Sequence, residues 1–118
     1  MKKILIVDDD KDVLYNMNTL LTNKGYEIQM IDNGYMAIMV AETFLPDIIL
    51  LDIHLHNYDG REICKKLKHN FITKRIPVIM MSVDMEKKEL LEKYEANDFL
   101  EKPFSITVLY NKINYFIG

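Results

Sequence analysis

Short, mostly apolar runs alternate along the chain with longer segments in which apolar residues recur every three or four positions. The runs lie at residues 3–7, 26–31, 48–52, 77–82 and 98–100. A run without polar alternation, such as Ile48-Ile49-Leu50-Leu51, is typical of a strand that is covered on both faces, as in a parallel sheet with helices on each side. The pattern therefore predicts five strands, most of them deeply buried.

The segments between these runs have the spacing of amphipathic helices. Five helices are expected, and they cover Lys11–Lys24, Tyr35–Phe44, a segment from Asp59 through Leu67, a segment through Leu90, Leu91 and Tyr94, and a final segment carrying Leu109, Ile113 and Phe116. The residues that favour helix ends are Asp10 or Asp12, Asp84 and Ser105 as N-terminal caps, and Gly25 and Pro46 as stops. The positions of the first helix expected to face the core are Val13, Met17, Leu20 and Leu21.

Strands that alternate with helices of this length are joined by right-handed crossovers, which predicts an α/β fold with a doubly wound, five-stranded parallel sheet. The 118 residues fit one domain spanning 1–118. The net charge of -3 argues against direct binding of nucleic acid. The chain has neither the ~20 consecutive apolar residues of a membrane span nor the pattern of a signal peptide. We therefore expect a cytoplasmic protein with no membrane partner.

Charged and hydroxyl side chains stand where the predicted strands end. Asp8 and Asp9 follow the first strand, Asp52 closes the third, Ser82 closes the fourth, and Lys102 follows the fifth. Folds of this kind bind ligands outside the carboxyl ends of their strands. The acids of the first loop would repel a phosphate, so the loop is expected to bind a cation, and carboxylates with open positions suit Mg²⁺.

Ordinary explanations exist for each of these residues alone. Acids near strand ends often cap helices or are simply solvated, and a lysine before a proline is common in turns. The spacing of Asp8, Asp10 and Asp12 resembles the start of an EF-hand loop, but Val13 replaces the required glycine and Thr19 the closing glutamate. The nearby histidines, His54 and His56, are expected to be solvated side chains or to tune access rather than to bind a transition metal.

The set as a whole closely resembles the receiver domain of two-component response regulators. The resembling stretches are Ile4-Leu5-Ile6-Val7-Asp8-Asp9-Asp10, Leu50-Leu51-Asp52, Asp59-Gly60, Pro77-Val78-Ile79-Met80-Met81-Ser82 and Phe99-Leu100-Glu101-Lys102-Pro103-Phe104. The resemblance implies a flavodoxin-like strand order 2-1-3-4-5 and a cis peptide between Lys102 and Pro103. It also implies that Asp52 is the phosphoacceptor. In the same way it implies a Mg²⁺ site made by Asp8, Asp9, Asp52 and the backbone carbonyl of His54.

The remaining roles also come from the resemblance. Ser82 and Lys102 would contact the phosphoryl group, and Ser82 and Phe99 would switch on phosphorylation. The donor would be a sensor histidine kinase or a histidine phosphotransfer protein, and the chain would assist only its own phosphorylation and dephosphorylation rather than act as an enzyme. The downstream effector cannot be identified, and a homodimer through the face of helix 4, strand 5 and helix 5 is allowed because Val108 and Tyr115 fall off the apolar stripe.

Three departures from the family pattern and two alternatives complete the expectations. Val83 stands where the family usually has alanine or glycine, and we expect its methyl groups to narrow the approach to Asp52. His56 stands where proline is usual, and Glu95 stands where a glycine is common near the start of the fifth strand. The first alternative is a binding module of the same fold that signals without phosphate, which the full set of acids, hydroxyl and lysine argues against. The second is a flavin-binding electron carrier, which the acidic first loop disfavours.

Overall fold

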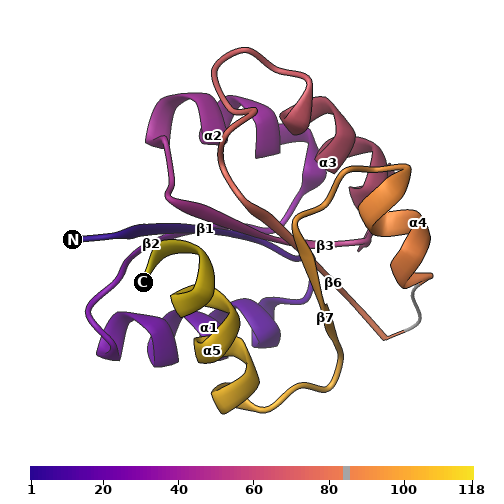
Figure 1. Ribbon diagram of the computed structural model, residues 1–118. Coiled ribbons are helices and arrows are strands. Elements are labelled where there is room, and N and C mark those ends of the chain that lie inside the picture. The colour runs from indigo at the N-terminus through magenta and orange to yellow at the C-terminus, as the bar shows by residue number, and fades with distance from the viewer. Residues whose placement is uncertain (84–85) are drawn as a thin grey trace.

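The computed structural model describes residues 1–83 and 86–118, and its centre is a five-stranded parallel sheet in the order β2-β1-β3-β6-β7 (Figure 1). The strands are β1 (Lys3–Val7), β2 (Glu27–Ile31), β3 (Ile48–Asp52), β6 (Val78–Ser82) and β7 (Asp98–Glu101). In sequence order of the sheet strands this is 2-1-3-4-5, so the predicted fold class and strand order are confirmed. Every residue of β3 and β6 is buried, as expected for strands covered on both faces.

Helices cover both faces of the sheet (Figure 1). They are α1 (Lys11–Asn23), the 3-10 turn η1 (Gly34–Met36), α2 (Ala37–Phe44), α3 (Gly60–Lys68), α4 (Lys87–Glu92) and α5 (Ile106–Ile117). One apolar cluster lies under α1 and α5, and a second lies under α2, α3 and α4. Among the described residues, no helix is both long and apolar enough to cross a bilayer.

Most helix ends follow from the local sequence. Asp10 caps α1 by accepting from the backbone N–H groups of Asp12 and Val13, and Ser105 caps α5 by accepting from Val108. Leu45 ends α2 in a left-handed conformation with φ of 51°, and its backbone N–H donates to the carbonyl oxygen of Ala41, as is common at helix C-termini. The predicted cap Asp84 lies outside the described residues.

The buried faces of two helices differ from the predicted ones. In α1 the core positions are Leu14, Met17 and Leu21, while Leu20 is exposed and Val13 only partly covered. These three buried residues have the spacing i, i+3, i+7. Val13 and Leu20 lie beside them, on the side of α1 that faces α5. In α4, Leu90 is buried and its neighbour Leu91 is exposed.

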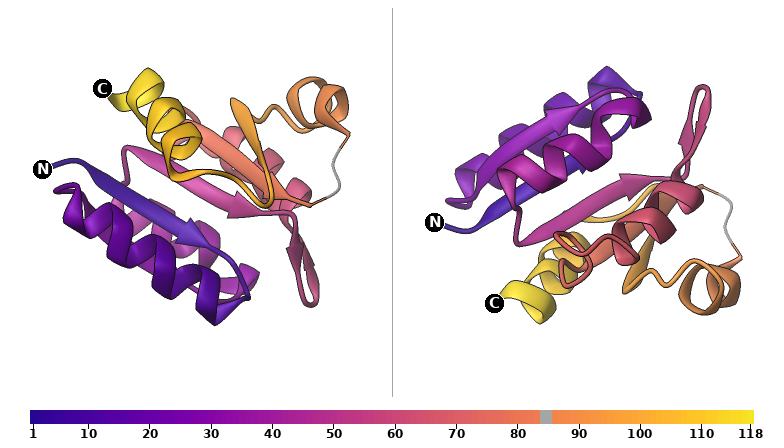
Figure 2. Two further views of the ribbon diagram at one scale, coloured as in Figure 1. Left: turned by 90° about the horizontal axis from the view of Figure 1, so that it is seen from below. Right: turned by 90° about the horizontal axis from the view of Figure 1, so that it is seen from above.

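A small antiparallel hairpin follows β3 and was not predicted. It pairs β4 (His54–Leu55) with β5 (Tyr58–Asp59). His56, in the turn between the two strands, has a φ of 34°. Figure 2 shows the hairpin projecting beyond the carboxyl end of β3, at the end of the sheet opposite the two chain termini. It therefore stands beside the strand ends where ligands bind in such folds.

Candidate functional site

Three carboxylates meet at the carboxyl ends of β1 and β3. Asp8, Asp9 and Asp52 each offer an oxygen, and these oxygens lie within 4.8 Å of one another. The sheet register brings them together, because Val7 pairs with Leu51 in the neighbouring parallel strand. The next residues along the two strands, Asp8 and Asp52, therefore lie at the same edge of the sheet. Asp8 and Asp52 are buried, whereas Asp9 is partly exposed. The predicted acidic cluster is thus present in the fold.

Lys102 reaches this cluster from the end of β7. Its ammonium nitrogen lies 2.6 Å from Asp8 Oδ2 and 3.7 Å from Asp52 Oδ2. Its backbone N–H donates to the carbonyl oxygen of Ser82 over 2.8 Å, which fixes the start of the loop after β7 against the end of β6. The Lys102–Pro103 peptide is cis, as the resemblance implied. Lys102 therefore joins two buried carboxylates that would otherwise repel each other.

The pKa of Asp52 is raised to about 6, chiefly by burial and next by the neighbouring Asp8 carboxylate. The Lys102 ammonium and the backbone N–H of His54, which lies 3.4 Å from Asp52 Oδ1, act in the opposite direction. The costs of desolvation and like charge therefore outweigh the contribution of one lysine. A cation placed among these oxygens would relieve both costs and hold Asp52 ionised near neutral pH.

The raised pKa of Asp52 predicts a pH-dependent stability difference. The pKa of Asp52 is about 6 in the folded protein, above the value of 3.8 for an ordinary aspartate, so the contribution of Asp52 to stability is fully present below pH 3.8 and lost as the pH rises through 6. Asparagine does not ionise. The free energy of unfolding of the Asp52→Asn variant, relative to that of the parent, should therefore rise between pH 4.5 and pH 7.5 by on the order of 1 to 3 kcal/mol. Urea unfolding in EDTA at both pH values measures this; an equal difference at the two values would contradict it.

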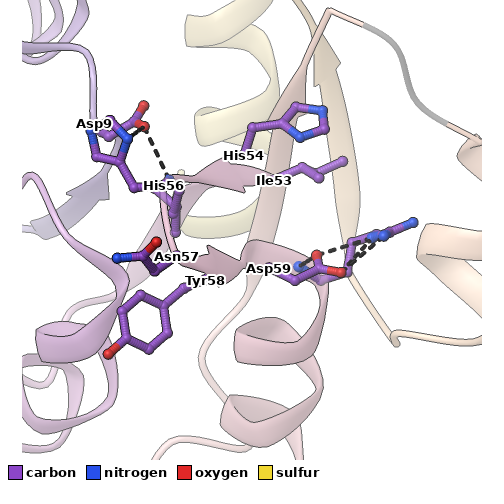
Figure 3. A pocket seen from close by; sticks show the side chains of 9 residues that line it. Asp9, Ile53, His54, His56, Asn57, Tyr58 and Asp59 are labelled. Atoms are coloured by element: carbon purple, nitrogen blue, oxygen red, sulfur yellow. Dashed lines mark hydrogen bonds and ion pairs between the residues drawn. The ribbon is translucent and has the colours of Figure 1, made fainter.

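The two histidines after Asp52 have different surroundings (Figure 3). His56 lies beside Asp9: its backbone N–H donates to Asp9 Oδ2 over 3.2 Å, and its ring Nδ1 lies 3.5 Å from the same oxygen. The ring of His54 lies apart from this pair (Figure 3). Within the described part of the chain, the only group of three metal-binding side chains is the acidic one, so the histidines do not converge on a transition metal. The His56 side chain is 80% exposed, as expected for a solvated residue, and the hydrogen bond to Asp9 comes from its backbone N–H.

Gly60 is a site residue whose role sequence reasoning missed, although it recognised Asp59-Gly60 as the start of a helix. A Cβ atom at Gly60 would lie 1.9 Å from the carbonyl oxygen of Asp52. The Gly60 N–H also donates to the carbonyl oxygen of Ile53 over 2.7 Å. The first turn of α3 is therefore packed directly against the backbone that carries Asp52, and only glycine permits this approach.

Ser82 and Phe99 take up the places expected from the strand pattern. Ser82 is buried at the end of β6, where it pairs in register with Glu101 of β7. Phe99 lies on the edge strand β7 and is partly buried against the cluster under α2, α3 and α4. Val83, by contrast, is 65% exposed and lines an apolar groove together with Val13, Leu20 and Pro103. Its predicted effect on the approach to Asp52 stays a prediction.

The chemistry of the donor set fits a hard divalent cation. Carboxylate oxygens are the ligands that Mg²⁺ prefers, and a cluster of this size leaves coordination positions for water and for a substrate oxygen. A carboxylate, an acidic cluster able to hold a cation and a lysine lie together at one edge of the sheet, and phosphoryl transfer uses groups of these kinds. The loops after β1 lack the glycine-rich phosphate cradle of nucleotide-binding folds.

Comparison with known proteins gives a consistent answer. A family model for the response regulator receiver domain matches residues 4–114. The alkaline phosphatase synthesis transcriptional regulatory protein PhoP of Bacillus subtilis is 36% identical over 106 residues, which are 88% of this chain and 43% of PhoP. The chain thus spans less than half the length of this relative.

Two solved structures extend the likeness to the whole fold. The chemotaxis protein CheY4 of Vibrio cholerae, 24% identical, has the same fold with a TM-score of 0.92 over 99% of both chains. The receiver domain of the sensor histidine kinase PA1611 of Pseudomonas aeruginosa, which has a magnesium ion coordinated in its active-site cleft, gives a TM-score of 0.85 at 26% identity, over 99% of this chain and 98% of that one. The chain belongs to the receiver-domain family of two-component response regulators.

Proposed function

We propose that Asp52 accepts a phosphoryl group from a phosphohistidine and that the resulting change at the strand ends is passed to a downstream partner. The observation that carries this proposal is the position of Lys102, which contacts Asp52 on one side of an acidic cluster able to hold a cation. The cluster fits the acidic Mg²⁺ site of receiver domains. In this proposal Mg²⁺ is held by Asp8, Asp9, Asp52 and the carbonyl oxygen of His54. The protein is proposed to work in the cytoplasm.

The transfer itself asks little of the protein beyond position and charge. An Asp52 carboxylate oxygen attacks the phosphorus in line, an oxygen–phosphorus bond forms, and the bond between phosphorus and the donor imidazole breaks. Bound Mg²⁺ would neutralise charge on the phosphoryl oxygens. The Lys102 ammonium pairs with a second oxygen, and the Ser82 hydroxyl donates a hydrogen bond to the product. Water later attacks the same phosphorus, which restores the carboxylate and releases inorganic phosphate.

The added charge supplies the reason for a switch. A phosphoryl group brings roughly two negative charges and new acceptor oxygens to a place where Lys102 now pairs with Asp8. Ser82 and Lys102 are joined through their backbones, so a shift of either moves the end of β7, and Phe99 lies on that strand. We propose that Phe99 changes position with this shift. The surface altered would be that of α4, β7 and α5, where Val108 and Tyr115 are exposed to an effector or a second copy.

The direct test is to treat the purified protein with Mg²⁺ and a small phosphodonor such as acetyl phosphate and to locate the modification. Intact mass spectrometry should show one added phosphoryl group, and digestion after borohydride trapping should place it on Asp52. Omission of Mg²⁺ should prevent the gain. A binding module that signals without phosphate would show no gain under any of these conditions, so the alternative is decided by the same experiment.

An apolar groove beside the site is a place for the donor protein to dock. It has a volume of about 480 Å³ and lies between α1 and the loop after β7. The apolar side chains that line it include Val13, Leu20, Val83, Pro103 and Ile106, and Lys102 lies at the same groove. A protein that presents a phosphohistidine to Asp52 must cover the surface around Lys102, so this groove offers buried apolar area to a kinase or phosphotransfer protein.

We expect Leu20→Asp to slow transfer from a protein donor by about tenfold or more, because a charge in an apolar contact costs at least 1.4 kcal/mol of binding. The rate with acetyl phosphate should be unchanged. The donor used is the kinase that phosphorylates the parent fastest in a panel of purified histidine kinases. Leu91→Asp is the matched control, because Leu91 is 41% exposed like Leu20 but lies on α4. Equal slowing by both variants would remove the groove from the proposal.

A further inference from the structure

The ring of Phe99 lies within reach of two lysine ammonium groups from different helices. Lys87 Nζ is 4.9 Å from the ring centroid and Lys112 Nζ is 5.0 Å from it. Lys87 opens α4 and Lys112 belongs to α5, and these helices pack on opposite faces of the sheet (Figure 1). The two ammonium groups therefore approach the same ring at β7, the edge strand of the sheet. Cations at this distance from an aromatic ring are attracted by its quadrupole.

Carboxylates of the same strand hold both lysines in place. Lys112 Nζ donates to both oxygens of Asp98, at 3.0 Å each, and the two side chains are about three-quarters buried. Lys87 Nζ lies 3.9 Å from Glu101 Oε2 in a more exposed pair. The Asp98 pair is bidentate and partly desolvated, so it fixes Lys112 more firmly than the surface pair fixes Lys87. The contact from Lys112 is expected to be the stronger of the two.

We propose that Lys87 and Lys112 clamp Phe99 in the position seen here and so set how much of the unphosphorylated protein takes the activated arrangement. This inference rests on the proposed role of Phe99 in the switch. If Phe99 leaves its present position, its ring loses both cations, and the lysines remain paired only with Asp98 and Glu101. Each lost contact is a cost to the activated arrangement, so the clamp keeps the resting state populated in the absence of phosphate.

The size of the effect follows from cation–π contacts at partly exposed sites. Such a contact typically changes a two-state ratio by about threefold, so removal of both should raise the ratio of activated to resting protein by about tenfold. A ligand that binds only the activated arrangement would then bind more tightly by the same factor, as long as that arrangement stays the minor one. Beryllofluoride with Mg²⁺, which mimics the phosphoryl group on the aspartate, is such a ligand.

The experiment compares the parent with Lys112→Met, Lys87→Met and the double variant. Methionine keeps an unbranched stem of similar length, so packing is preserved. It removes the ammonium group and with it the pair to Asp98 or Glu101, and a Phe99→Leu background separates the loss of that pair from the loss of the contact with the ring. Phe99 is observed by fluorine NMR of protein that contains 4-fluorophenylalanine, and the beryllofluoride concentration that half-converts the signal is measured at saturating Mg²⁺. We expect this concentration to fall somewhat more than threefold for Lys112→Met, somewhat less than threefold for Lys87→Met, and about tenfold for the double variant.

Two controls separate the clamp from general effects of charge. Lys93→Met removes an exposed lysine that lies 5.2 Å from the Tyr94 ring and has no contact with Phe99, so it should leave the midpoint unchanged. Lys112→Arg keeps a cation able to stack on the ring and should restore the parent midpoint. In a Phe99→Leu background there is no aromatic face, and Lys112→Met should then have no effect on a beryllofluoride midpoint followed by amide resonances.

The outcomes distinguish the clamp from the switch. A parent whose Phe99 signal stays fixed at saturating beryllofluoride would overturn the proposed role of Phe99 and the clamp with it. A parent signal that moves, with midpoints that are equal in the parent and the double variant, would overturn the clamp alone. A fall that Lys93→Met reproduces would also overturn it, because net charge rather than the contact with Phe99 would then be responsible.

Discussion

Asp52→Asn is expected to abolish phosphorylation by acetyl phosphate and Mg²⁺ to the detection limit of intact mass spectrometry. Asp8 is fully buried, and its two oxygens accept from Lys102 and from the Asp10 N–H. Asp52 keeps slight exposure, and its oxygen lies 3.7 Å from the Lys102 ammonium at the edge of the cluster, so it is the acid that a phosphodonor can reach. Asparagine has nearly the same shape but lacks the anionic oxygen that forms the bond to phosphorus. The loss should therefore be complete rather than partial, which makes this the largest effect expected at the site.

Unfolding does not explain such a loss, because the variant is expected to be more stable than the parent at neutral pH. The buried Asp52 carboxylate carries a desolvation cost that asparagine avoids. Asp59→Asn is a matched control: Asp59 lies after the same strand, but it caps α3 and pairs with Arg61, so its carboxylate is engaged away from the cluster. That variant should gain the phosphoryl group as the parent does. A phosphoryl group found on the Asp52→Asn protein would show that another side chain is the acceptor.

The strands and the cluster at their ends were predictable because their signals are local. Four consecutive apolar residues before Asp52 can be buried on both faces of a sheet, and the alternation with helices fixes parallel strands whose carboxyl ends share an edge. Asp8 and Asp52 were therefore expected to meet without any knowledge of their contacts. The helix caps Asp10 and Ser105 were predictable for the same reason, since a cap needs only the residues that follow it.

Features that depend on contacts between distant segments could not be predicted in this way. The pairing of His56 with Asp9 spans 47 positions and requires the left-handed backbone of the hairpin turn, for which the sequence has no glycine signal. The two lysines beside Phe99 come from helices on opposite faces of the sheet, and nothing in their spacing indicates that both approach one ring. On α1 the choice between Leu14 and Val13 as the core position was decided by the packing of α5 and the sheet.

Gly60→Ala is expected to destabilise the protein by about 3 kcal/mol or more and to weaken Mg²⁺ binding at the same time. The new Cβ would lie 1.9 Å from the Asp52 carbonyl oxygen and 2.8 Å from the Ile53 Cα, and both are backbone atoms that cannot turn aside. Either α3 must move away from β3 or the strand end must shift, and overpacking of this kind typically costs 1 to 3 kcal/mol or more. A shift of the strand end displaces the Asp52 side chain from Asp9, so the metal site should suffer as well.

Gly25→Ala separates this effect from the general cost of replacing a glycine. Gly25 follows α1 with a φ of 95° and has open space where a Cβ would stand, so alanine there meets only backbone strain of about 1 kcal/mol. Its Mg²⁺ affinity should equal that of the parent, because Gly25 lies at the other end of α1 from the acidic cluster. Urea unfolding and Mg²⁺ titration followed by NMR of the Asp9 and Asp52 amides measure both quantities. If Gly60→Ala bound Mg²⁺ as tightly as Gly25→Ala, the packing of α3 would not be what positions Asp52.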